Sequence, residues 1–310
     1  MTTVWITGGK GFIGRNLAKF IATQQCDVFG IGHGFWSAQE PENWSYSGWM
    51  NAEINFSNLN HLASESGLPK FIFHLAGGSA VGPSIQNPYE DFQRTVDTTA
   101  RLLDWVRQVS PETKVIGVSS AAVYGAGFLA PIKEEAIGLP YSPYGFHKAM
   151  LESLFNSYRQ TFALNLTVVR LFSVYGAGLE KQLLWDICNK LETSTNRRIL
   201  LNGTGNEIRD WLHVADAIKL MWLVADKKTL NQPFINGGTG IATSIQNIAQ
   251  QVANAWGGDF EIDFSGTARK GDPQSLVADI TTANNLGFSA NTFLTDGLSD
   301  FVEWFKARKV

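Results

Sequence analysis

The sequence predicts an α/β fold with a doubly wound parallel sheet and a smaller α/β lobe that is discontinuous in the chain. Over the first 170 or so residues, short apolar runs alternate with amphipathic stretches, which is typical of βαβ units. A glycine-rich turn directly follows the first apolar run. After residue 171 the alternation loosens, and Pro/Gly-punctuated strands appear beyond residue 234. The first part is therefore expected to form a Rossmann-type sheet.

Strands and helices are expected in alternation along this first part. The expected strands are Val4–Thr7, Asp27–Ile31, Lys70–Ala76, Lys114–Ser119 and Leu166–Leu171. The expected helices are Ile13–Thr23, Tyr89–Gln108 and Tyr144–Thr161. Segment 33–51 holds five aromatic side chains without a clear period, so we expect a folded loop there.

The rest of the chain predicts a less regular lobe. Helices are expected over Lys181–Leu191, Val214–Ala225 and around 244–256 and 295–308, with a short strand at Ile199–Asn202. Because the helix Val214–Ala225 is expected to return to the first domain, we assign residues 1–171 and about 210–235 to that domain. Residues of about 172–209 and 236–310 form the second lobe.

Composition narrows the class of partner. With 310 residues and 44% hydrophobic content, the chain can bury a large core. A net charge of −3 gives no basic stripe for nucleic acid, so small molecules and a second copy of the chain are the expected partners. Cys26 and Cys188 are too far apart for a metal site or a disulfide framework. With only these two cysteines, a reducing cytoplasm is expected and no metal is. No apolar run approaches the ~20 residues of a membrane helix, so we expect no membrane partner.

The glycine-rich turn carries the first chemical signal. Gly8, Gly11 and Gly14 form a G-x-x-G-x-x-G pattern between a strand and a helix. Glycines let the backbone approach a pyrophosphate closely, and the helix N-terminus offers free N–H groups. Such turns also serve as plain connectors, but the strand before and the helix after are what the motif requires. We therefore expect Gly8, Gly11, Phe12, Ile13 and Gly14 to bind a dinucleotide.

The end of the second strand bears on the kind of dinucleotide. An acidic residue that binds the ribose 2′-hydroxyl is expected there, but the strand ends in Gly32 and His33. Nothing in this position repels a 2′-phosphate, and His33 could contact one. NADP(H) is thus slightly favoured over NAD(H). The alternative is that His33 is simply a loop residue.

Tyr144 and Lys148 carry the second signal. Four residues apart on one helix, they project from the same face. A nearby ammonium stabilises a phenolate and lowers the pKa of a tyrosine from its ordinary ~10, which makes Tyr144 a candidate acid and base at an alcohol or ketone carbon. The pair also occurs by chance in many helices. Here it follows Ser119 and Ser120, which either supply a hydroxyl donor or form a small-residue strand end.

With these motifs together, the chain resembles the extended short-chain dehydrogenase/reductase family, particularly its nucleotide-sugar epimerases, dehydratases and ketoreductases. The likeness runs nearly from end to end. Its landmarks are Thr7–Gly14, His74–Gly78, Ser119–Gly125, Tyr144–Lys148, Arg170–Gly176, Gly203–His213 and Arg269–Asp272.

The resemblance implies specific roles in catalysis and cofactor binding. Ser120 matches the residue that hydrogen-bonds the reacting sugar oxygen, and Tyr144 matches the acid/base. Lys148 matches the lysine that binds the nicotinamide ribose and lowers the pKa of the tyrosine. The landmark that contains Leu75, Ala76 and Gly77 is expected to contact the cofactor as well.

The resemblance also implies substrate contacts in the second lobe, which becomes a nucleotide-sugar-binding lobe. Arg209 and Arg269 match arginines that grip a diphosphate, for which a planar guanidinium is suited. The alternative is that each arginine pairs with a nearby aspartate, Asp210 or Asp272. Ser173 stands where many epimerases have Asn, which leaves that substrate contact open.

The leading hypothesis is a 4-ketoreductase of a nucleotide-linked 4-keto-6-deoxy sugar, in which Tyr144 gives a proton to the oxygen at C4. A 4-epimerase with tightly bound NAD would use the same residues. The 4,6-dehydratases carry Asp-Glu where this chain has Ala121 and Ala122, which argues against dehydration. A non-catalytic dinucleotide sensor is less favoured, because it would not need an activated tyrosine. Helices 89–108 and 144–161 resemble the pair that forms the homodimer interface of the family, so a homodimer is expected under every reading.

Overall fold

The computed structural model describes residues 2–34, 36, 40–227, 230, 232–267 and 272–308. Two compact units make up the chain. Unit 1 consists of Met1–Tyr124, Gly138–Arg170 and Ile218–Ile235, and unit 2 of Gly125–Ile137, Leu171–Ala217 and Asn236–Val310. Residues 125–137, 171 and 210–217 were expected in the first domain but group with unit 2.

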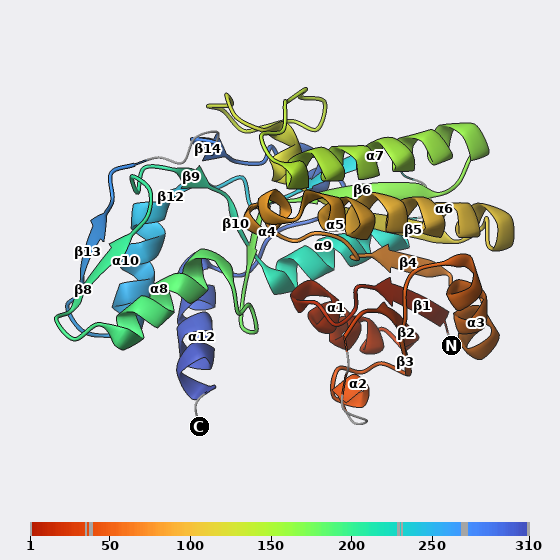
Figure 1. Cartoon of the computed structure of the whole chain (residues 1–310), viewed down its shortest axis with the longest axis horizontal. Coiled ribbons are helices and arrows are strands. Elements are labelled where there is room, and N and C mark those ends of the chain that lie inside the picture. The colour runs from red at the N-terminus through yellow and green to blue at the C-terminus, as the bar shows by residue number, and fades with distance from the viewer. Residues whose placement is uncertain are drawn as a thin grey trace. The chain divides into compact units, whose positions relative to one another are not determined.

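The centre of unit 1 is a seven-stranded parallel sheet, which confirms the expected fold class (Figure 1). Its strands lie in the order β11-β6-β5-β4-β1-β2-β3, so the strand order reverses between β1 and β4. In such sheets ligands bind at the carboxyl ends of the strands beside this reversal. The strands are β1 (Thr2–Thr7), β2 (Cys26–Gly32), β3 (Gly48–Asn51), β4 (Phe71–His74), β5 (Lys114–Ser120), β6 (Leu166–Leu171) and β11 (Phe234–Gly237).

Helices cover the sheet and bury its apolar side chains. Trp5 on β1 and Trp105 on α6 are fully buried and pack with their ring centroids 5.2 Å apart. α4, α5 and α6 each contact α7, and Figure 1 shows α5, α6 and α7 beside β5 and β6. The helices are α1 (Phe12–Ala22), α2 (Glu40–Asn43), α3 (Phe56–Ser66), α4 (Val81–Gln86), α5 (Pro88–Phe92), α6 (Thr98–Val109), α7 (Pro143–Phe162) and α9 (Val214–Asp226).

The interpretation of segment 33–51 as a folded loop was wrong. The segment contains α2 and the edge strand β3, which pairs in parallel with β2 from Phe29↔Gly48 to Gly32↔Asn51. Trp49 packs onto Gly30 so closely that a Cβ on this glycine would lie 2.5 Å from the indole. Tertiary packing of aromatic rings therefore makes a strand where the sequence shows no period. Residues 35 and 37–39 lie outside the described residues.

The helix expected over Tyr89–Gln108 is interrupted. α5 passes into a π-helical turn, η1 (Gln93–Asp97), before α6 begins. Thr95 in this turn accepts a hydrogen bond from the backbone N–H of Gly78 at 2.8 Å. The helix α3, which the sequence did not predict, is capped by Asn55, whose side chain accepts a hydrogen bond from the N–H of Asn58.

Within its described residues, unit 2 consists of two short strand pairs, one three-stranded sheet and four helices. α10 packs against both α8 and α12, and aromatic side chains such as Trp185 and Phe305 meet there with ring centroids 4.9 Å apart. Its helices are α8 (Gln182–Thr193), α10 (Ile245–Trp256), α11 (Thr281–Asn285) and α12 (Leu294–Ala307). Its strands are β7 (Ser173–Tyr175), β8 (Arg198–Leu201), β9 (Ile208–Arg209), β10 (Trp211–His213), β12 (Thr243–Ser244), β13 (Glu261–Phe264) and β14 (Ser275–Leu276). Across the described residues, none of the helices is both long and apolar enough to cross a membrane.

Candidate active site

The glycine turn packs tightly between β1 and α1. Gly8 has a φ of +67°, and a Cβ on it would lie 2.8 Å from the backbone nitrogen of Ala76. Gly14 has equally little room, because its Cβ would lie 2.7 Å from Gly9. Gly11 precedes α1 as its N-cap and has no side chain to cap the helix. Phe12 and Ile13 therefore begin a helix whose first N–H groups point out of the turn.

Tyr46 stabilises this turn by hydrogen bonding, a contact that the sequence did not reveal. Its buried hydroxyl lies 3.1 Å from the carbonyl oxygen of Gly9 and 3.2 Å from that of Gly14, and it donates to them. Burial raises the pKa of Tyr46 well above its ordinary value, so the hydroxyl keeps its proton. The ring of Trp49 lies beside Tyr46 with centroids 5.8 Å apart. The aromatic segment thus holds the glycine turn in shape.

The end of β2 has no acidic side chain but is organised by an amide. The side-chain oxygen of Asn51 on β3 accepts a hydrogen bond from the backbone N–H of Gly34 at 3.0 Å. His33 lies between Gly32 and Gly34 and is exposed. The position expected to contact a ribose or its 2′-phosphate is therefore a short polar turn held by Asn51.

A chain of hydrogen bonds ties β1 to β4 and α6. The hydroxyl of Thr7 lies 2.8 Å from Nδ1 of His74, and Nε2 of His74 lies 2.9 Å from the hydroxyl of Thr99. Burial, with a smaller effect from the charge of Lys148, lowers the pKa of His74 to about 3, so this imidazole is neutral. The Thr7 hydroxyl also accepts from the N–H of Ala76. This network fixes the start of the loop that holds Leu75, Ala76 and Gly77.

Tyr144 lies in the first turn of α7, and two serines position it. Ser142 caps the helix by accepting from the N–H of Gly145, and Ser84 accepts from the N–H of Tyr144 at 3.0 Å. Tyr144 is half-buried, and the partial removal of its phenol from water raises the pKa of Tyr144. A hydrogen bond from Ser120 acts in the opposite direction, and the charge of Asp91 raises this pKa further.

Lys148 lies one turn further along α7, on the same face. Its ammonium donates to the carbonyl oxygen of Val118 at 3.0 Å and lies 5.9 Å from the centroid of the Tyr144 ring. Burial lowers the pKa of Lys148 to about 8, while Asp91 and Glu152 oppose this effect. A Cβ on Gly77 would lie 3.3 Å from the ammonium nitrogen.

The structure thus brings Ser120, Tyr144 and Lys148 together at the carboxyl end of β5. The expected low pKa of Tyr144 is not found: burial keeps its pKa above the ordinary value, and the hydrogen bond from Ser120 provides the lowering effect. The neighbouring hydroxyl of Ser119 is buried and has no hydrogen-bond partner within the described part of the chain. An unpartnered buried hydroxyl at this strand end is available to a ligand.

Tyr124, the other tyrosine of this region, has a structural role. Its hydroxyl accepts a hydrogen bond from Arg170 at 2.9 Å. Arg170 also forms a buried, two-armed ion pair with Glu152, with donor–acceptor distances of 2.9 and 2.8 Å. In this ion pair the buried charges of Glu152 on α7 and Arg170 on β6 neutralise each other. Because its hydroxyl is bonded to Arg170, Tyr124 belongs to the core rather than to the acid/base group.

The substrate-contact residues expected in the second lobe lie in unit 2. Ser173 begins β7, and its N–H donates to the carbonyl oxygen of Asp210 at 2.9 Å. Arg209 on β9 pairs with Asp272 at 3.0 Å rather than with Asp210. Asp210 is fully buried and accepts instead from the N–H groups of Thr239, Gly240 and Ala278. Arg269 lies outside the described residues.

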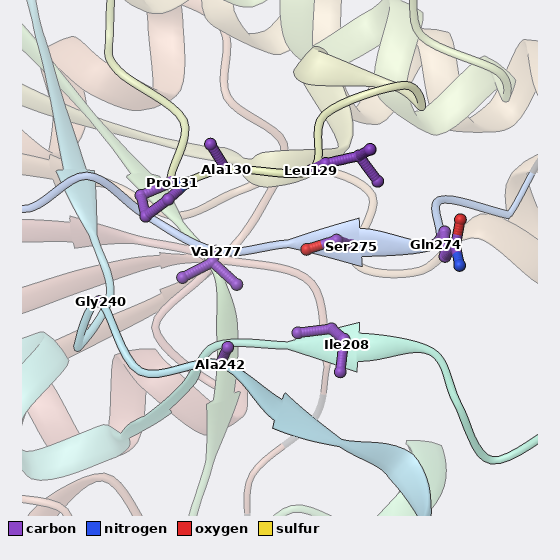
Figure 2. Close-up of a pocket in the computed structure, with 9 residues that line it drawn as sticks. All are labelled: Leu129, Ala130, Pro131, Ile208, Gly240, Ala242, Gln274, Ser275 and Val277. Atoms are coloured by element: carbon purple, nitrogen blue, oxygen red, sulfur yellow. The ribbon is translucent and has the colours of Figure 1, made fainter.

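Unit 2 also contains an apolar pocket of about 250 Å³ (Figure 2). Ile208 lines it, whereas Arg209 does not, as expected for successive residues of a strand. In Figure 2, Leu129 and Pro131 lie on the strip of chain opposite Ile208, with Val277 between them. The nine lining residues are Leu129, Ala130, Pro131, Ile208, Gly240, Ala242, Gln274, Ser275 and Val277.

The family model described as "NAD dependent epimerase/dehydratase family" matches residues 4–236, which include the glycine turn, Ser120 and the Tyr144–Lys148 pair. The chain belongs to this family. It is therefore an NAD-dependent enzyme of the extended short-chain dehydrogenase/reductase type, as the sequence resemblance indicated.

Members of the epimerase/dehydratase family resemble this chain over its full length. A CDP-paratose 2-epimerase from Salmonella typhi is 28% identical, covering 96% of this chain and 98% of the relative. A UDP-glucose 4-epimerase from Mycolicibacterium smegmatis is 27% identical, covering 97% of both chains. The solved structure of MoeE5 in complex with UDP-glucuronic acid and NAD is 28% identical, with a TM-score of 0.86 over 99% of this chain and 100% of that one.

A further structural neighbour supports the fold. The UDP-glucose 4-epimerase from Thermotoga maritima superposes with a TM-score of 0.89 over 100% of both chains, at 24% identity. In the epimerase/dehydratase family the cofactor is NAD, and NAD is the nucleotide in the MoeE5 structure. The expected preference for NADP(H) therefore finds no support in these comparisons.

Proposed function

We propose that this enzyme is an NAD-dependent epimerase that inverts C4 of a nucleotide-diphosphate sugar. The observation that carries the proposal is the group formed by Ser120, Tyr144 and Lys148 beside a glycine turn. Similarity to a UDP-glucose 4-epimerase over 97% of the chain supports it.

NAD fits the residues of unit 1. Gly8 and Gly14 leave no space for a side chain, so the backbone of the turn is free to approach a pyrophosphate. The turn that includes Gly11, Phe12 and Ile13 would hold the phosphates, and the loop of Leu75, Ala76 and Gly77 with Ser119 would line the remainder. His33 and Asn51 lie where a ribose would be held. When bound, NAD supplies a reversible hydride acceptor at the sugar carbon.

A side chain of the protein transfers the proton. Tyr144 removes the proton from the sugar 4-hydroxyl and later returns one to the 4-keto oxygen. Because burial favours the neutral phenol, the phenolate must be stabilised while the keto sugar is present. Ser120 does so by hydrogen bonding and also orients the sugar oxygen. Lys148, charged below a pH of about 8, adds a positive field on the same helix face.

A nucleotide-diphosphate sugar is the proposed substrate, and unit 2 is proposed to bind it. The solved structure of MoeE5 contains a UDP-sugar. Arg209 has a planar fork suited to a diphosphate, and would exchange Asp272 for the phosphate. Arg269 and Ser173 complete the proposed contacts.

A 4-ketoreductase is the second candidate, for one reason. Gly32 provides no carboxylate to reject a 2′-phosphate, so NADPH is not excluded by charge at that position. The same residues would then act in one direction, with Tyr144 as the acid. Dehydration is disfavoured, because Ala121 and Ala122 cannot transfer protons.

We also propose a homodimer. Apolar side chains gather on α4, α5 and α7, three helices that contact one another. In the isolated chain Tyr89 is 71% exposed and Ile85 61% exposed, and a cluster of exposed apolar side chains is typical of an interaction surface. The exposed large apolar residues on these helices are Ile85, Tyr89, Phe92, Phe146, Met150 and Phe162. The free cysteines Cys26 and Cys188 are compatible with a cytoplasmic location, which we also propose.

Turnover of a panel of UDP-, CDP- and dTDP-sugars tests the proposal. Purified enzyme is incubated with each sugar with and without NADPH, and products are identified by NMR. The epimerase interconverts C4 epimers without added NADPH. Consumption of one NADPH for each 4-keto sugar, with no epimerisation, would favour the ketoreductase instead.

A further inference from the structure

A buried aspartate–histidine pair lies beside the proposed acid/base group and has no part in the mechanism so far. Oδ2 of Asp91 on α5 lies 2.5 Å from Nδ1 of His147 on α7. The two side chains are only 7% and 11% exposed. Since an ionised carboxylate can only accept, the imidazole N–H donates.

His147 lies on α7 between the two proposed catalytic residues of this helix. It lies three residues after Tyr144 and directly before Lys148, so it shares the face from which Tyr144 projects. The ring of Phe92 packs edge-on against the imidazole with centroids 5.7 Å apart. Packing and the hydrogen bond together hold His147 in one orientation, and His147 in turn holds Asp91.

The other oxygen of Asp91 points toward the loop after β4. A Cβ on Gly78 would lie 1.8 Å from Oδ1 of Asp91, so the absence of a side chain at Gly78 makes room for the carboxylate. The N–H of Gly78 donates to Thr95, and both Thr95 and Lys148 lie within 3.3 Å of the Cβ position of Gly77. Asp91 is therefore built into the surroundings of Lys148 rather than placed there by chance.

We propose that Asp91, held by His147, is a positioning residue that keeps Lys148 charged beside Tyr144 and so sets the upper pH limit of the reaction. This inference rests on the proposed roles of Tyr144 and Lys148. Removing an ammonium from water favours its neutral form, and a nearby buried carboxylate opposes that change. The same carboxylate disfavours the phenolate of Tyr144, so the resting site holds a neutral phenol and an ammonium.

The charges around Asp91 agree with this role. Asp91 is the largest of the influences that raise the pKa of Lys148 against burial, and Glu152 is the next. Glu152 is already committed to Arg170 on β6. His74 on β4 is neutral. Near Asp91 in the sequence, Glu90 and Arg94 form an exposed ion pair with each other. Asp91 thus acts on Lys148 while bonded to an imidazole, whereas the charge of Glu152 is engaged by a guanidinium.

NMR of lysine Nζ groups tests the inference without requiring turnover. The protein is labelled with ¹⁵N-lysine, and the Lys148 resonance is assigned with a Lys148→Met variant. We expect the wild-type Lys148 to titrate near pH 8. Asp91→Asn should lower this midpoint by about one pH unit. Glu90→Gln removes the same charge from an exposed position on the same helix and should leave it unchanged. An unchanged midpoint in folded Asp91→Asn overturns the role of Asp91.

Two variants of His147 test its part and remain informative if Asp91→Asn does not fold. His147→Asn keeps a donor close to the position of Nδ1, and His147→Leu removes it. The leucine variant should move the Lys148 midpoint toward lower pH, because a buried carboxylate without a donor is less stable when ionised. The asparagine variant should titrate as the wild type does. Equal midpoints in the two variants overturn the positioning role.

The pH dependence of kcat separates this inference from the proposed function. In Asp91→Asn the alkaline limb of kcat should move to lower pH together with the Lys148 midpoint, while the KM for the nucleotide sugar stays unchanged. A midpoint that moves while the limb does not would contradict the proposed role of Lys148 in turnover. An NMR midpoint that does not move contradicts the role of Asp91 itself.

Discussion

The ammonium of Lys148 donates a hydrogen bond to the backbone carbonyl oxygen of Val118 over 3.0 Å, from α7 to the end of β5. This bond places a buried charge next to Ser119 and Ser120. The carbonyl stabilises the ammonium but does not replace its hydration fully, since burial still lowers the pKa of Lys148 to about 8. The site thus holds a lysine that is charged at neutral pH and sensitive to its surroundings.

Replacing Lys148 should make the protein more stable and less active. The pKa of Lys148 falls from 10.5 in the unfolded chain to about 8 in the folded one, so folding at pH 7 carries the cost of the buried charge. At 1.36 kcal/mol per pH unit, that cost is about 3 kcal/mol. Between pH 8 and 10.5 the unfolded chain keeps a proton that the folded chain has lost, so stability rises with pH there.

Lys148→Met should therefore unfold at higher denaturant concentration than the wild type at pH 7, and this difference should shrink toward pH 10. Urea unfolding at both pH values measures it. A variant that is less stable than the wild type at pH 7 would show that the bond to Val118 outweighs the cost of burial.

Tyr144→Phe should abolish most of the turnover, because no other group would take and return the proton. The expected loss in kcat is about 10²- to 10⁴-fold, measured with the best nucleotide sugar of the panel. Tyr124→Phe is the matched control, since its hydroxyl accepts a hydrogen bond from Arg170 within the core. This control should cost about 1 kcal/mol of stability and leave kcat nearly unchanged.

Tyr46→Phe should weaken the binding of NAD without altering the acid/base group. The variant loses the hydroxyl that bonds to Gly9 and Gly14, so the turn becomes less well ordered. We expect stability to fall by about 1 kcal/mol and the Kd for NAD to rise severalfold, as measured by calorimetry. Tyr89→Phe, which alters an exposed hydroxyl, should change neither. Equal NAD affinity in Tyr46→Phe and the wild type would contradict this stabilising role.

Arg170→Met should destabilise unit 1 strongly. It leaves the carboxylate of Glu152 buried without its partner, which typically costs about 3–5 kcal/mol. Combining it with Glu152→Met removes both charges and should recover much of the loss. Urea unfolding of the single and double variants measures the two losses of stability. A double variant as unstable as the single one would show that lost packing, rather than an unpaired charge, causes the loss.

Charges placed on the apolar helix surface should separate the proposed dimer. Tyr89→Glu combined with Met150→Glu introduces two carboxylates into a surface that is exposed in the single chain. Light scattering after size-exclusion chromatography should show a dimer for the wild type and a monomer for the variant. A wild-type monomer at micromolar concentration would contradict the dimer.

Local sequence patterns were sufficient for the sheet and for much of the candidate site. The glycine turn, the apolar strands and the Tyr144–Lys148 spacing depend on residues close together in the chain, and the sheet confirms the fold class. Strand β3 was missed because it is formed by Trp49 packing over Gly30, a contact between separate segments. The π-helical turn η1 was missed because Thr95 bonds to Gly78, far from it in sequence.

The pKa values of the site residues also depend on contacts between residues far apart in the sequence. From spacing alone, Lys148 was expected to lower the pKa of Tyr144, but spacing does not report burial, which raises that pKa. Asp91 and His147 had a signal that was overlooked, namely a charged residue within the apolar stripe of helix 89–108 and a histidine inside the Tyr-Gly-Phe-His-Lys motif. Only the fold shows that the two meet.

The fate of the hydrogen at C4 tests the central claim most directly. Purified enzyme is given a nucleotide sugar deuterated at C4, without added cofactor, and the product is examined by NMR. The account predicts that the C4 epimer forms and keeps its deuterium, because the hydride is removed and returned within one active site. Deuterium that passes to a free nicotinamide nucleotide, or an epimer that carries solvent hydrogen at C4, would contradict it.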